Sequence, residues 1–338
     1  MSDATARIME PRGRFLAFPA LMYGLLLNCA GFAVYFLSVL LRVACLFLDP
    51  HGRFLGIIQG LLWYSGMPVF VGFLLILFDL FVLLPRKRTR RDVRWDPPRS
   101  PAVTVVLTAY NDESSIGQAV EDFRTHPNVK RVIVVDNNSR DRTAEIGRRA
   151  GAEVVREEQQ GYGHCVYRAL TEGCSCSDTE LTLLCEGDMT FRACDIDKFL
   201  AYLPHADIVN GTRIVEQLRE LNTQLTTFMY YGNFFAGKLL EAKHLGQGTF
   251  TDVGTTYKLC RNTSLERLLP LLNPAINLEF NAHFLDTALG NGFAIVECPV
   301  SFHLRLGVSK GGNVNNLRAL QVGLRMILGI VFGWGKRR

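Results

Sequence analysis

The sequence predicts an α/β domain with a mostly parallel sheet, preceded by a two-helix transmembrane hairpin. Charged residues are very scarce between residues 15 and 84, whereas the rest of the 338-residue chain resembles an ordinary α/β protein in composition. From residue 102 onward, short apolar segments alternate with segments of helical pattern. Several apolar segments end in carboxylate and amide side chains, which places candidate functional groups at one edge of the predicted sheet.

Two apolar segments support the hairpin. Residues 15–40 and 54–84 are each long enough to cross a bilayer, which requires about 20 apolar residues. A signal peptide is disfavoured because its apolar core is shorter. A hairpin buried in a soluble protein is also disfavoured, because a domain of modest size would have to hide two helices that are apolar all round. Residues 42–53 connect the spans and contain DPHG, a turn signal. We therefore expect residues 15–84 to form a transmembrane hairpin.

Basic residues flank the hairpin on both sides. Residues 1–14 contain three arginines, and the run PRKRTRRDVR follows the second span. Because positive charge accumulates on the cytoplasmic side, we expect both ends and the following domain in the cytoplasm, in a multi-pass protein of the cell inner membrane. The position of the basic run favours lipid headgroups over nucleic acid as its partner. Asp79 is expected to contact this run rather than to act within the membrane.

The nine cysteines show no metal-binding repeat. Cys174 and Cys176 form a CxC pair, but no second pair lies nearby at the spacing of a zinc finger. We expect nine free thiols in a reducing compartment and no zinc site.

A linker and an α/β domain follow the hairpin. Residues 85–101 are basic and contain prolines, so we expect an extended spacer, and residues 102–312 form the domain. Strands that alternate with helices imply right-handed βαβ units, in which ligands bind at the carboxyl ends of the strands. The predicted strands are residues 103–108, 129–136, 152–157 and 180–188, and the predicted helices are residues 114–124, 140–151 and 163–173.

Three of the predicted strand ends are rich in acceptor oxygens. The first strand leads into TAYNDES, the second ends in VVDNNSRD, and the fourth ends in CEGD. Such an edge suits a ribose, a base edge and a divalent cation. There is no GxGxxG after the first strand and no GKS/T loop, which disfavours a dinucleotide dehydrogenase and a P-loop NTPase.

Taken in order, these segments resemble motifs of the family-2 glycosyltransferases of the GT-A fold. TAYNDE resembles the PAYNEE-type first loop, VVDNNSRDRT resembles the DDGSxDxT segment, and EGDMTF occupies the position of the DXD metal motif. Farther along, VNGTRIVEQ and ECPVSFHLRLGVSKGGN resemble the GSR and EvPvxFxxRxxGxSK segments of polyprenyl-phosphate (dolichol-phosphate) hexose synthases. The resemblance extends over residues 103–313 and does not include the hairpin.

The resemblance implies roles for particular residues. Glu186 and Asp188 would hold Mg²⁺ or Mn²⁺ on the donor diphosphate. The Arg and Lys side chains of the catalytic group would contact phosphates. The nucleotide sugar would be bound by Ala109, Tyr110, Asn111, Glu113, Asp136, Asn137 and Gly187, and the catalytic group would comprise Asp188, Arg213, Asp252, Arg305 and Lys310.

Three departures from the family motifs leave the donor sugar open. The first Asp of DXD is Glu186, the Pro of the first loop is Thr108, and the second acid of the DD pair is Asn137. A Glu carboxylate still binds a hard divalent cation, but its additional methylene group changes the geometry of the site.

The acceptor determines what the protein must supply. A hydroxyl acceptor, on a glycolipid or diacylglycerol, needs a general base, for which Asp252 and Glu279 are the candidates. A lipid phosphate is already an anion and needs positioning and charge screening instead. The resemblance favours inverting transfer of a hexose from a UDP- or GDP-sugar to polyprenyl phosphate at the cytoplasmic face. A non-catalytic module that binds nucleotide sugars is a further alternative. Separately, we expect His283 to be a packed helix residue rather than a ligand.

Residues 313–338 are predicted to form an amphipathic interfacial helix, with a core helix as the alternative. Apolar residues recur at helical spacing and are followed by Trp334 and three basic residues. These apolar positions are Leu317, Leu320, Leu324, Ile327 and Leu328. Taken together, the motifs and the apolar segments predict a nucleotide sugar, a polyprenyl-phosphate lipid and membrane lipids as partners. A homo-oligomer would add further copies of the chain to these partners.

Overall fold

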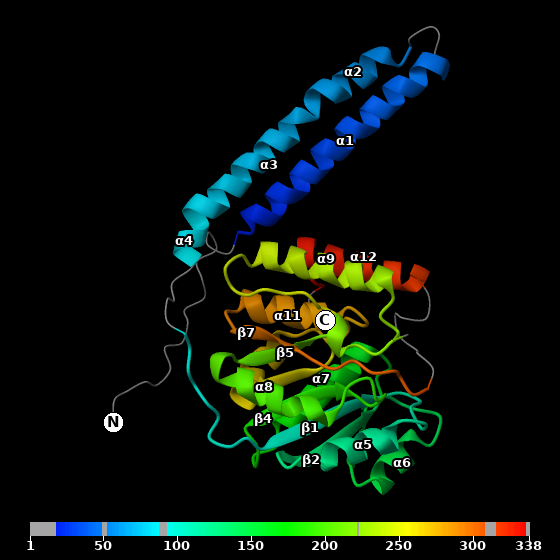
Figure 1. Ribbon diagram of the computed structural model, residues 1–338, viewed down its shortest axis with the longest axis vertical. Coiled ribbons are helices and arrows are strands. Elements are labelled where there is room, and N and C mark those ends of the chain that lie inside the picture. Colours follow the sequence, from blue (N-terminus) through cyan, green and yellow to red (C-terminus); the bar gives the residue numbers. More distant parts are fainter. Residues whose placement is uncertain (1–17, 49–52, 88–92, 222, 308–315, 336–338) are drawn as a thin grey trace. The chain divides into compact units, whose positions relative to one another are not determined.

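The structure is a computed structural model that describes residues 18–48, 53–87, 93–221, 223–307 and 316–335. The chain divides into two compact units, and the apolar helices belong to the first and the sheet to the second (Figure 1). The first unit comprises Met1–Arg91 with Ala242–Gly246, and the second comprises Asp92–Glu241 with Gln247–Arg338.

The first unit contains two helical segments that pack along each other as an antiparallel pair (Figure 1). By length and composition, Ala20–Phe47 and Leu55–Lys87 could each cross a membrane. The first segment is α1 (Ala20–Leu48), and the second comprises α2 (Leu55–Tyr64), α3 (Gly66–Phe78), the π-helical turn η1 (Asp79–Leu83) and α4 (Leu84–Lys87).

The first helix is longer than the sequence pattern predicts. It continues to Leu48 instead of ending at residue 40, and so includes much of the predicted connection. Residues 41–48 read LRVACLFL and contain neither glycine nor proline, and a single arginine does not interrupt an α-helix. The DPHG turn signal, residues 49–52, lies outside the described residues.

Small residues let the two segments of the hairpin approach closely. A Cβ atom added to Gly24 would lie 2.6 Å from the carbonyl oxygen of Gly72, and one added to Gly72 would lie 2.6 Å from that of Gly24. Close contact between small residues is a common basis of helix association in membranes, where burial of apolar surface gives no net drive. The pairing of α1 with α3 therefore depends on these glycines.

Asp79 links the same two segments by polar contacts. Its fully buried carboxylate accepts a hydrogen bond from the backbone N–H of Leu21 (2.7 Å) and forms an ion pair with Lys87 (2.8 Å). N–H groups in the first turn of a helix have no partner within the helix, so Asp79 caps α1. The contact with Lys87 confirms the expected pairing of Asp79 with the basic run.

Among the described residues, seven strands form one sheet in the order β3-β2-β1-β4-β6-β5-β7. Neighbouring strands are parallel, except that β6 is antiparallel to β4 and to β5. This confirms the predicted α/β class with a mostly parallel sheet. The strands are β1 (Val103–Ala109), β2 (Val129–Asp136), β3 (Glu153–Arg156), β4 (Leu181–Glu186), β5 (Ile208–Thr212), β6 (Lys258–Arg261) and β7 (Ile295–Pro299).

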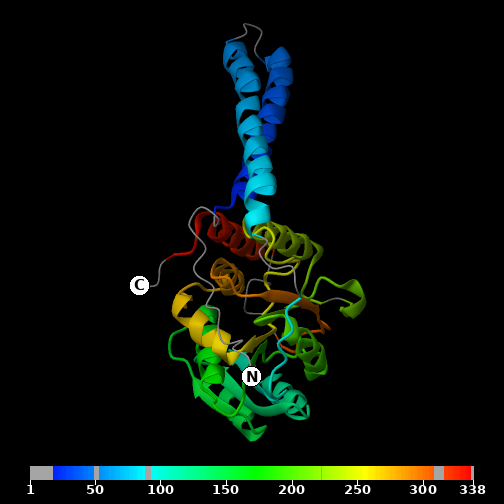
Figure 2. The ribbon, with the colours of Figure 1, turned by 90° about the vertical axis from the view of Figure 1, so that its left-hand side faces the viewer.

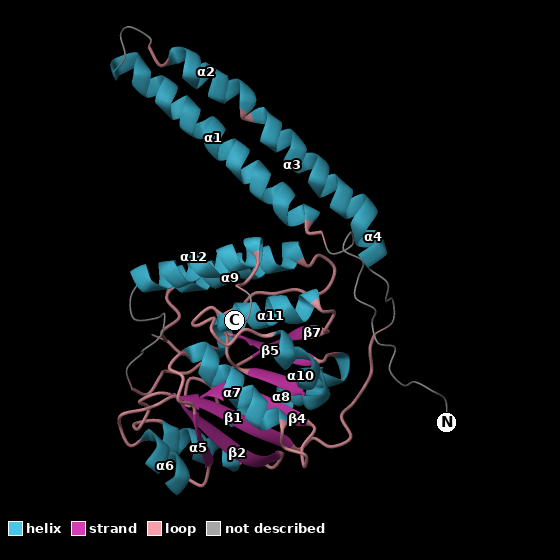
Figure 3. Ribbon diagram, turned by 180° about the vertical axis from the view of Figure 1, so that it is seen from behind, coloured by secondary structure: helices cyan, strands magenta, loops and turns pink. Residues whose placement is uncertain are grey.

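Helices pack around this sheet (Figures 1 and 3). α7 (Tyr162–Cys174) packs on β1, β2 and β4, whereas α5 (Ile116–Arg124) packs on β2 and on α6 (Thr143–Arg149). α9 (Thr227–Lys243) and α12 (Asn316–Phe332) lie side by side near α11 (Phe280–Gly290) (Figures 1 and 2). The remaining helices are α8 (Ile196–Tyr202) and α10 (Asn262–Leu268), with the short 3-10 helices η2 (Ala193–Asp195), η3 (Leu203–His205), η4 (Glu216–Leu218) and η5 (Leu269–Leu271).

The strand register aligns the three predicted strand ends. Every residue of β1 is buried, because this strand lies inside the sheet with its apolar side chains packed on both faces. Thr108 of β1 pairs with Glu186 of β4, and Ala109 pairs with Asp136 of β2. The loops that follow β1, β2 and β4 therefore leave the sheet at one edge, as the sequence predicts.

Of the predicted linker, residues 85–87 belong to α4, and residues 93–101 contact the rest of the second unit. Residues 93–101 have an irregular backbone, but Arg94 forms ion pairs with Asp96 (3.0 Å) and Asp207 (2.9 Å). The ring of Trp95 lies 5.4 Å from that of His205, centroid to centroid. These contacts fasten the linker beside the start of β5.

Removing the carboxylate of Asp79 should destabilise the hairpin. In Asp79→Ala, the buried ammonium of Lys87 and the N–H of Leu21 lose their partner, at a cost of about 3–5 kcal/mol. Full-length protein in detergent should then unfold at a lower temperature, and Asp79→Ala/Lys87→Met should recover most of the loss. Equal thermal stability of the wild type and Asp79→Ala would contradict this role of Asp79.

Candidate active site

Strained turns follow the three aligned strand ends. Within the described ranges, the non-glycine residues with positive φ are Asn111 (51°), Asn138 (61°) and Met189 (68°). They lie shortly after β1, β2 and β4 respectively. Non-glycine residues rarely adopt this left-handed conformation, and those that do are concentrated at functional sites. The backbone thus marks the same sheet edge as the sequence motifs.

Two carboxyl groups lie at the end of β4, one half-buried and one almost fully buried. Glu186 is the last residue of the strand, and its Oε1 accepts a hydrogen bond from the hydroxyl of Thr256 (2.8 Å). Asp188 is almost fully buried, and its Oδ1 accepts hydrogen bonds from the backbone N–H (3.0 Å) and hydroxyl (2.6 Å) of Thr190. A Cβ atom on the intervening Gly187 would lie 2.6 Å from the terminal Cδ1 of Ile116 of α5, so a larger residue there would displace that side chain.

Arg305 provides a positive charge to this pair. Its Nη1 lies 3.2 Å from Asp188 Oδ2, and its Nη2 lies 3.9 Å from Asp112 Oδ1. The arginine is held there by backbone hydrogen bonds between two segments, from Leu306 N–H to the carbonyl of Asp188 (3.0 Å) and from His303 N–H to that of Thr190 (2.9 Å). The RLG motif and the EGD motif, far apart in the sequence, therefore form one site.

The electrostatics of the site favour a further cation. Burial raises the pKa of Glu186 to about 7, the neighbouring Asp188 adds to this effect, and Arg305 opposes it. Burial acts to lower the pKa of Arg305, but the surrounding carboxylates raise it overall, so this side chain stays charged. Asp188 Oδ2 is buried and has no hydrogen-bond partner within the described residues. Buried carboxylate oxygens that face each other are characteristic of sites for Mg²⁺ and Mn²⁺.

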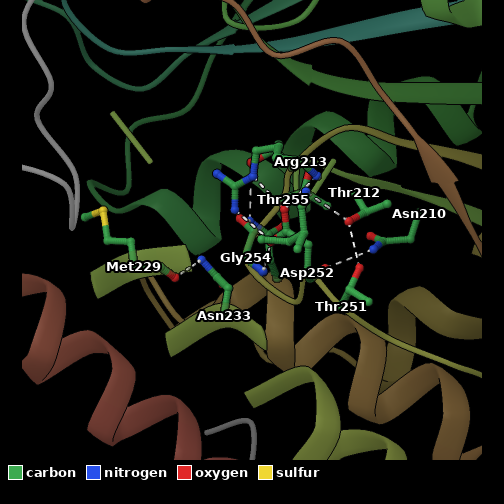
Figure 4. A network of polar contacts seen from close by, with 12 residues as sticks. Asn210, Thr212, Arg213, Met229, Asn233, Thr251, Asp252, Gly254 and Thr255 are labelled. Carbon is green, nitrogen blue, oxygen red and sulfur yellow. Dashed lines mark hydrogen bonds and ion pairs between the residues drawn. The ribbon is translucent and has the colours of Figure 1, made fainter. Parts of the chain in front are cut away.

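Arg213 and Asp252 form a buried pair next to this site (Figure 4). Asp252 accepts hydrogen bonds from Arg213 Nε (2.6 Å) and Nη2 (2.8 Å), and also from the backbone N–H groups of Arg213 and Gly254 (both 3.1 Å). Although burial acts to raise the pKa of Asp252, Arg213 lowers it overall. A fully buried carboxylate with a lowered pKa is a poor general base, and Arg213 engages both carboxylate oxygens of Asp252.

Glu297 of β7 fixes the loop that carries Asp252. Its Oε2 accepts hydrogen bonds from the backbone N–H (2.9 Å) and hydroxyl (2.8 Å) of Thr251, and its Oε1 accepts one from the N–H of Asp252 (3.1 Å). The Thr251 hydroxyl also lies 2.8 Å from that of Thr212 at the end of β5. The position of Arg213 therefore depends on β5, on β7 and on the loop that contains Thr251 and Asp252.

The predicted nucleotide-binding residues divide into two groups. Ala109, Tyr110 and Asn137 line the cavity of the site. The other four shape its loops. Asn111 Oδ1 accepts from Arg140 N–H (2.8 Å), Glu113 from Arg142 N–H (3.1 Å) and Asp136 from Ser139 N–H (3.3 Å), while Gly187 forms the turn before Asp188.

Besides lining the cavity, the side chain of Asn137 also holds a neighbouring loop. Its Oδ1 accepts the backbone N–H of Gly161 (2.9 Å), and its Nδ2 donates to the carbonyl of Gln159 (2.8 Å). The amide therefore holds the loop that leads into α7 against the end of β2. Lys310, in contrast, lies in residues 308–315, outside the described part of the chain.

A cavity of about 560 Å³ extends from the strand ends to α9 and α12. One part is polar and the other is apolar, and Arg318 of α12 also lines it. The polar part includes Tyr110, Asp112, Asn137, Gln160, Tyr162, Glu186, Asp188, Arg213, Asn281 and Arg305. The apolar part includes Phe228, Met229, Phe235 and Ala236 of α9 with Leu320, Leu324, Met326 and Ile327 of α12. Neither Asp252 nor Glu279, the two candidate bases, is among the lining residues.

α12 combines the two alternatives that the sequence left open. Its residues Met326, Ile330 and Val331 are buried, as in a core helix. A separate stripe remains exposed to solvent, as expected of an interfacial helix. The stripe consists of Leu317, Leu320, Leu324, Leu328 and Phe332, and α9 adds exposed Phe228, Tyr231 and Phe235.

Sequence reasoning gave no specific role to several residues of the site, although it noted Asp112 among the acids at the end of the first strand. Asp112 lies within the TAYNDES motif, and its Oδ2 accepts the N–H of Tyr110 (3.0 Å) while its own N–H donates to Thr143 (2.7 Å). Tyr162, Thr256 and Asn281 meet beside Glu186 from three separate segments, and no local motif marks them. The nine cysteines are unpaired, as predicted, and the described residues contain no cluster of three or more His, Cys, Asp or Glu arranged to hold a metal.

Comparisons with known proteins identify the family of this domain. Residues 104–269 match the sequence model of glycosyl transferase family 2. The chain is 29% identical over 212 residues to a dolichyl-phosphate hexose transferase of Haloferax volcanii, covering 62% of this chain and 86% of that protein. It is 30% identical over 113 residues to protein RfbJ of Shigella flexneri, covering 33% of this chain and 84% of that protein.

A solved structure shares the fold. It is the glucosyl-3-phosphoglycerate synthase of Mycobacterium tuberculosis, in complex with Mn²⁺, UDP and phosphoglyceric acid. The TM-score is 0.50 at 18% sequence identity, over 68% of this chain and 77% of that one. Together with the strand order, this likeness confirms the GT-A fold that the sequence motifs predict.

His283 is a packed residue of α11, as the sequence predicts. Its Nε2 accepts the backbone N–H of Asn273 (2.9 Å), and its ring lies 5.3 Å from that of Trp334, centroid to centroid. Because Nε2 is an acceptor, the ring must be neutral, and burial lowers its pKa to about 4.

Acidification should weaken the fold through this histidine. The unfolded chain binds the proton more tightly, since its histidine pKa is about 6.5. The contribution to the free energy of unfolding is present above pH 6.5 and is lost as the pH falls towards 4, by at most roughly 3 kcal/mol. Denaturant unfolding at several pH values should show a smaller acid-dependent loss in His283→Gln than in the wild type. Identical pH dependence of the two proteins would exclude this role.

Proposed function

The chain belongs to glycosyl transferase family 2, and we propose that it transfers a hexose from a UDP- or GDP-sugar to polyprenyl phosphate, with inversion, at the cytoplasmic face of a membrane. The observation that carries the proposal is the cavity, which joins a polar end with carboxylates and arginines to an apolar end between two helices. A nucleotide sugar matches the first end. A phosphate on a long apolar chain matches both ends of the cavity, because the phosphate needs polar surroundings and the chain needs apolar ones.

A divalent cation, Mg²⁺ or Mn²⁺, fits the polar end. Glu186 and Asp188 would hold it, and the buried Asp188 Oδ2 offers an oxygen without a hydrogen-bond partner in the described residues. When bound, the cation would neutralise charge on the diphosphate of the leaving nucleotide. Within this proposal Glu186 is a ligand despite its extra methylene group, because it lines the cavity together with Asp188 and its Oε1 is held by the hydroxyl of Thr256.

The chain's own cationic groups would position the phosphates. Arg305 remains charged among three carboxylates and lines the cavity, so its guanidinium is available at the polar end. Arg213 also lines the cavity while Asp252 holds its Nε and Nη2. A guanidinium fixed in this way binds a phosphate without losing side-chain freedom. Lys310, which follows Arg305 in the resembling motif, is proposed as a further phosphate contact.

A phosphate acceptor explains why the cavity needs no dedicated base. The attacking phosphate oxygen already carries negative charge at pH 7, whereas a sugar or glycerol hydroxyl must lose a proton. Of the two candidate bases, Asp252 is paired with Arg213, and Glu279 lies outside the cavity lining. The name of the Haloferax volcanii relative, a dolichyl-phosphate hexose transferase, also supports a lipid-phosphate acceptor. Family membership favours an enzyme over a non-catalytic binding module.

The apolar helices support a membrane location. Two segments are long and apolar enough to cross a bilayer, and the basic flanks of the hairpin favour a cytoplasmic catalytic domain. The exposed stripe of α12 suits the headgroup region, where the phosphate of a polyprenyl lipid also lies. We therefore propose a multi-pass protein of the cell inner membrane.

Direct assay tests the proposed reaction. Full-length protein in detergent with Mn²⁺ or Mg²⁺ is incubated with undecaprenyl phosphate and a panel of UDP- and GDP-hexoses, and the lipid is analysed by mass spectrometry. We expect the mass of a lipid-phosphate hexose with at least one donor. Folded protein that yields no product with any donor, but glycosylates diacylglycerol or a glycolipid, would overturn the proposal.

Asp188→Asn tests the metal assignment. The amide has the same size as the carboxylate but lacks the negative charge that attracts Arg305 and the cation. We therefore expect kcat to fall by roughly 100-fold or more. Asp197→Asn, an exposed carboxylate of α8, is the matched control and should retain wild-type activity. Metal-dependent turnover at the wild-type rate in Asp188→Asn would exclude Asp188 as a ligand.

Glu279→Gln separates the two acceptor classes. With a phosphate acceptor, the variant should keep kcat within about 3-fold of the wild type, whereas loss of a general base costs roughly 10²–10⁴-fold. Steady-state rates with undecaprenyl phosphate decide between these values. A loss in the larger range, in a variant with the thermal stability of the wild type, would favour a hydroxyl acceptor.

A further inference from the structure

A continuous chain of polar side chains leads from the protein interior to Glu186. The hydroxyl of Thr256 contacts Glu186 Oε1 (2.8 Å) and also the hydroxyl of Tyr162. Asn281 Nδ2 lies 2.9 Å from the Tyr162 oxygen, and Lys258 Nζ lies 3.3 Å from Asn281 Oδ1. The members come from α7, the segment before β6, β6 itself and α11.

Chemistry fixes the direction of these hydrogen bonds. The lysine ammonium only donates, so Asn281 accepts with Oδ1 and donates with Nδ2 to the oxygen of Tyr162. The Tyr162 hydroxyl is then free to donate to Thr256, and the Thr256 hydroxyl donates to the carboxylate of Glu186. Every bond points the same way, from the amine of Lys258 towards the carboxyl group of Glu186. In a buried site such aligned bonds polarise and strengthen one another.

Lys258 is buried beside the ring of Phe284, with its Nζ 5.9 Å from the ring centroid, and without a carboxylate partner among the described residues. Its side chain is fully inaccessible, and burial lowers its pKa to about 7. Within the described residues it forms no ion pair, and its ammonium donates instead to the carbonyl of Thr255 and to Asn281. Burying an amine without a carboxylate partner is costly, and such groups persist where their position has a use.

The length of Glu186 is matched to this chain. An Asp at the same position would withdraw the carboxyl group by one carbon–carbon bond, about 1.5 Å. The hydrogen bond to Thr256, now 2.8 Å, would then be lost. The Glu in place of the family Asp and the hydroxyl of Thr256 therefore form a complementary pair.

We propose that Thr256, Tyr162, Asn281 and Lys258 are positioning residues that hold the carboxylate of Glu186 towards Asp188 for a divalent cation. This inference rests on the proposed function, because the cation is the one that the donor diphosphate requires. Tyr162, Thr256 and Asn281 also line the cavity, whereas Lys258 does not, and the proposed role of all four is towards Glu186. Their contribution is to fix one ligand of the cation, and loss of such supporting contacts typically costs about 10–100-fold in metal affinity.

Metal affinity, measured without turnover, tests the proposal. Full-length protein in detergent is titrated with Mn²⁺ in the presence of UDP or of GDP, and the free ion is followed by its electron paramagnetic resonance signal. Thr256→Val and Tyr162→Phe should each weaken Mn²⁺ binding by about 10-fold or more. Thr256→Ser keeps the hydroxyl and should restore the wild-type value.

Tyr257→Phe is the matched control. This neighbouring residue is buried, and its hydroxyl donates to the carbonyl of Arg192 (2.8 Å), away from Glu186. The variant loses one buried hydroxyl, as Tyr162→Phe does, but should bind Mn²⁺ as the wild type does. A loss of affinity equal to that of Tyr162→Phe would show a general packing effect and overturn the proposal.

A double-mutant cycle tests the match between Glu186 and Thr256. In a Glu186→Asp background the contact is already lost, so adding Thr256→Val should change Mn²⁺ affinity by less than about 2-fold. Additive losses would overturn the proposal, as would wild-type affinity in both Thr256→Val and Tyr162→Phe. If the wild type itself bound no Mn²⁺ with either nucleotide and transferred no hexose, the proposed function would fail instead.

Discussion

Two carboxyl groups lie side by side at the end of β4, one almost fully buried and one half-buried, and the residues around them offset the cost of this arrangement. Glu186 and Asp188 repel each other, and burial adds to the cost, which is expressed in the raised pKa of Glu186. The protein compensates with Arg305 at 3.2 Å from Asp188 and with hydroxyl donors from Thr190 and Thr256. The segment that carries Arg305 is therefore held on the loop after β4, and the strand ends, α11 and residues 303–306 form one site.

The same site faces surroundings of two kinds. On one side the carboxylates and arginines suit phosphates and a cation, and on the other α9 and α12 present apolar side chains to the same cavity. α12 is partly buried against the domain and partly exposed through its stripe of leucines. A substrate that is charged at one end and apolar along its length would satisfy both sides. The pairing of Arg213 with Asp252 holds one further guanidinium of the cavity lining in place.

The sequence predicts the frame of this site well, because its main signals are local. Glu186, Asp188 and Tyr110 directly follow short buried strands, and parallel strands bring their carboxyl ends to one edge. Arg305 could be predicted only through the resemblance to a family, since its partner Asp188 is distant in the chain. The end of α1 was misplaced because eight helix-compatible residues follow the predicted span. Asp252 illustrates a different limit, because its residue type suggests a base, whereas the sequence does not reveal that Arg213 engages both of its carboxylate oxygens.

The residues that hold Glu186 could not be predicted at all. Thr256, Tyr162 and Asn281 are common polar residues in segments without a motif, and only the packing of α7 and α11 brings them together. Their importance follows from the direction of hydrogen bonds, which no single-residue pattern carries.

Photo-crosslinking tests most directly whether the carboxylates and the apolar helices form one binding site. A polyprenyl phosphate with a diazirine in its first isoprene units is bound to the full-length protein, irradiated, and mapped by mass spectrometry. If the account is correct, label appears on Phe235 of α9 and Leu324 of α12 and is displaced by unlabelled undecaprenyl phosphate. Displaceable label confined to the hairpin helices, with α9 and α12 unlabelled, would contradict it.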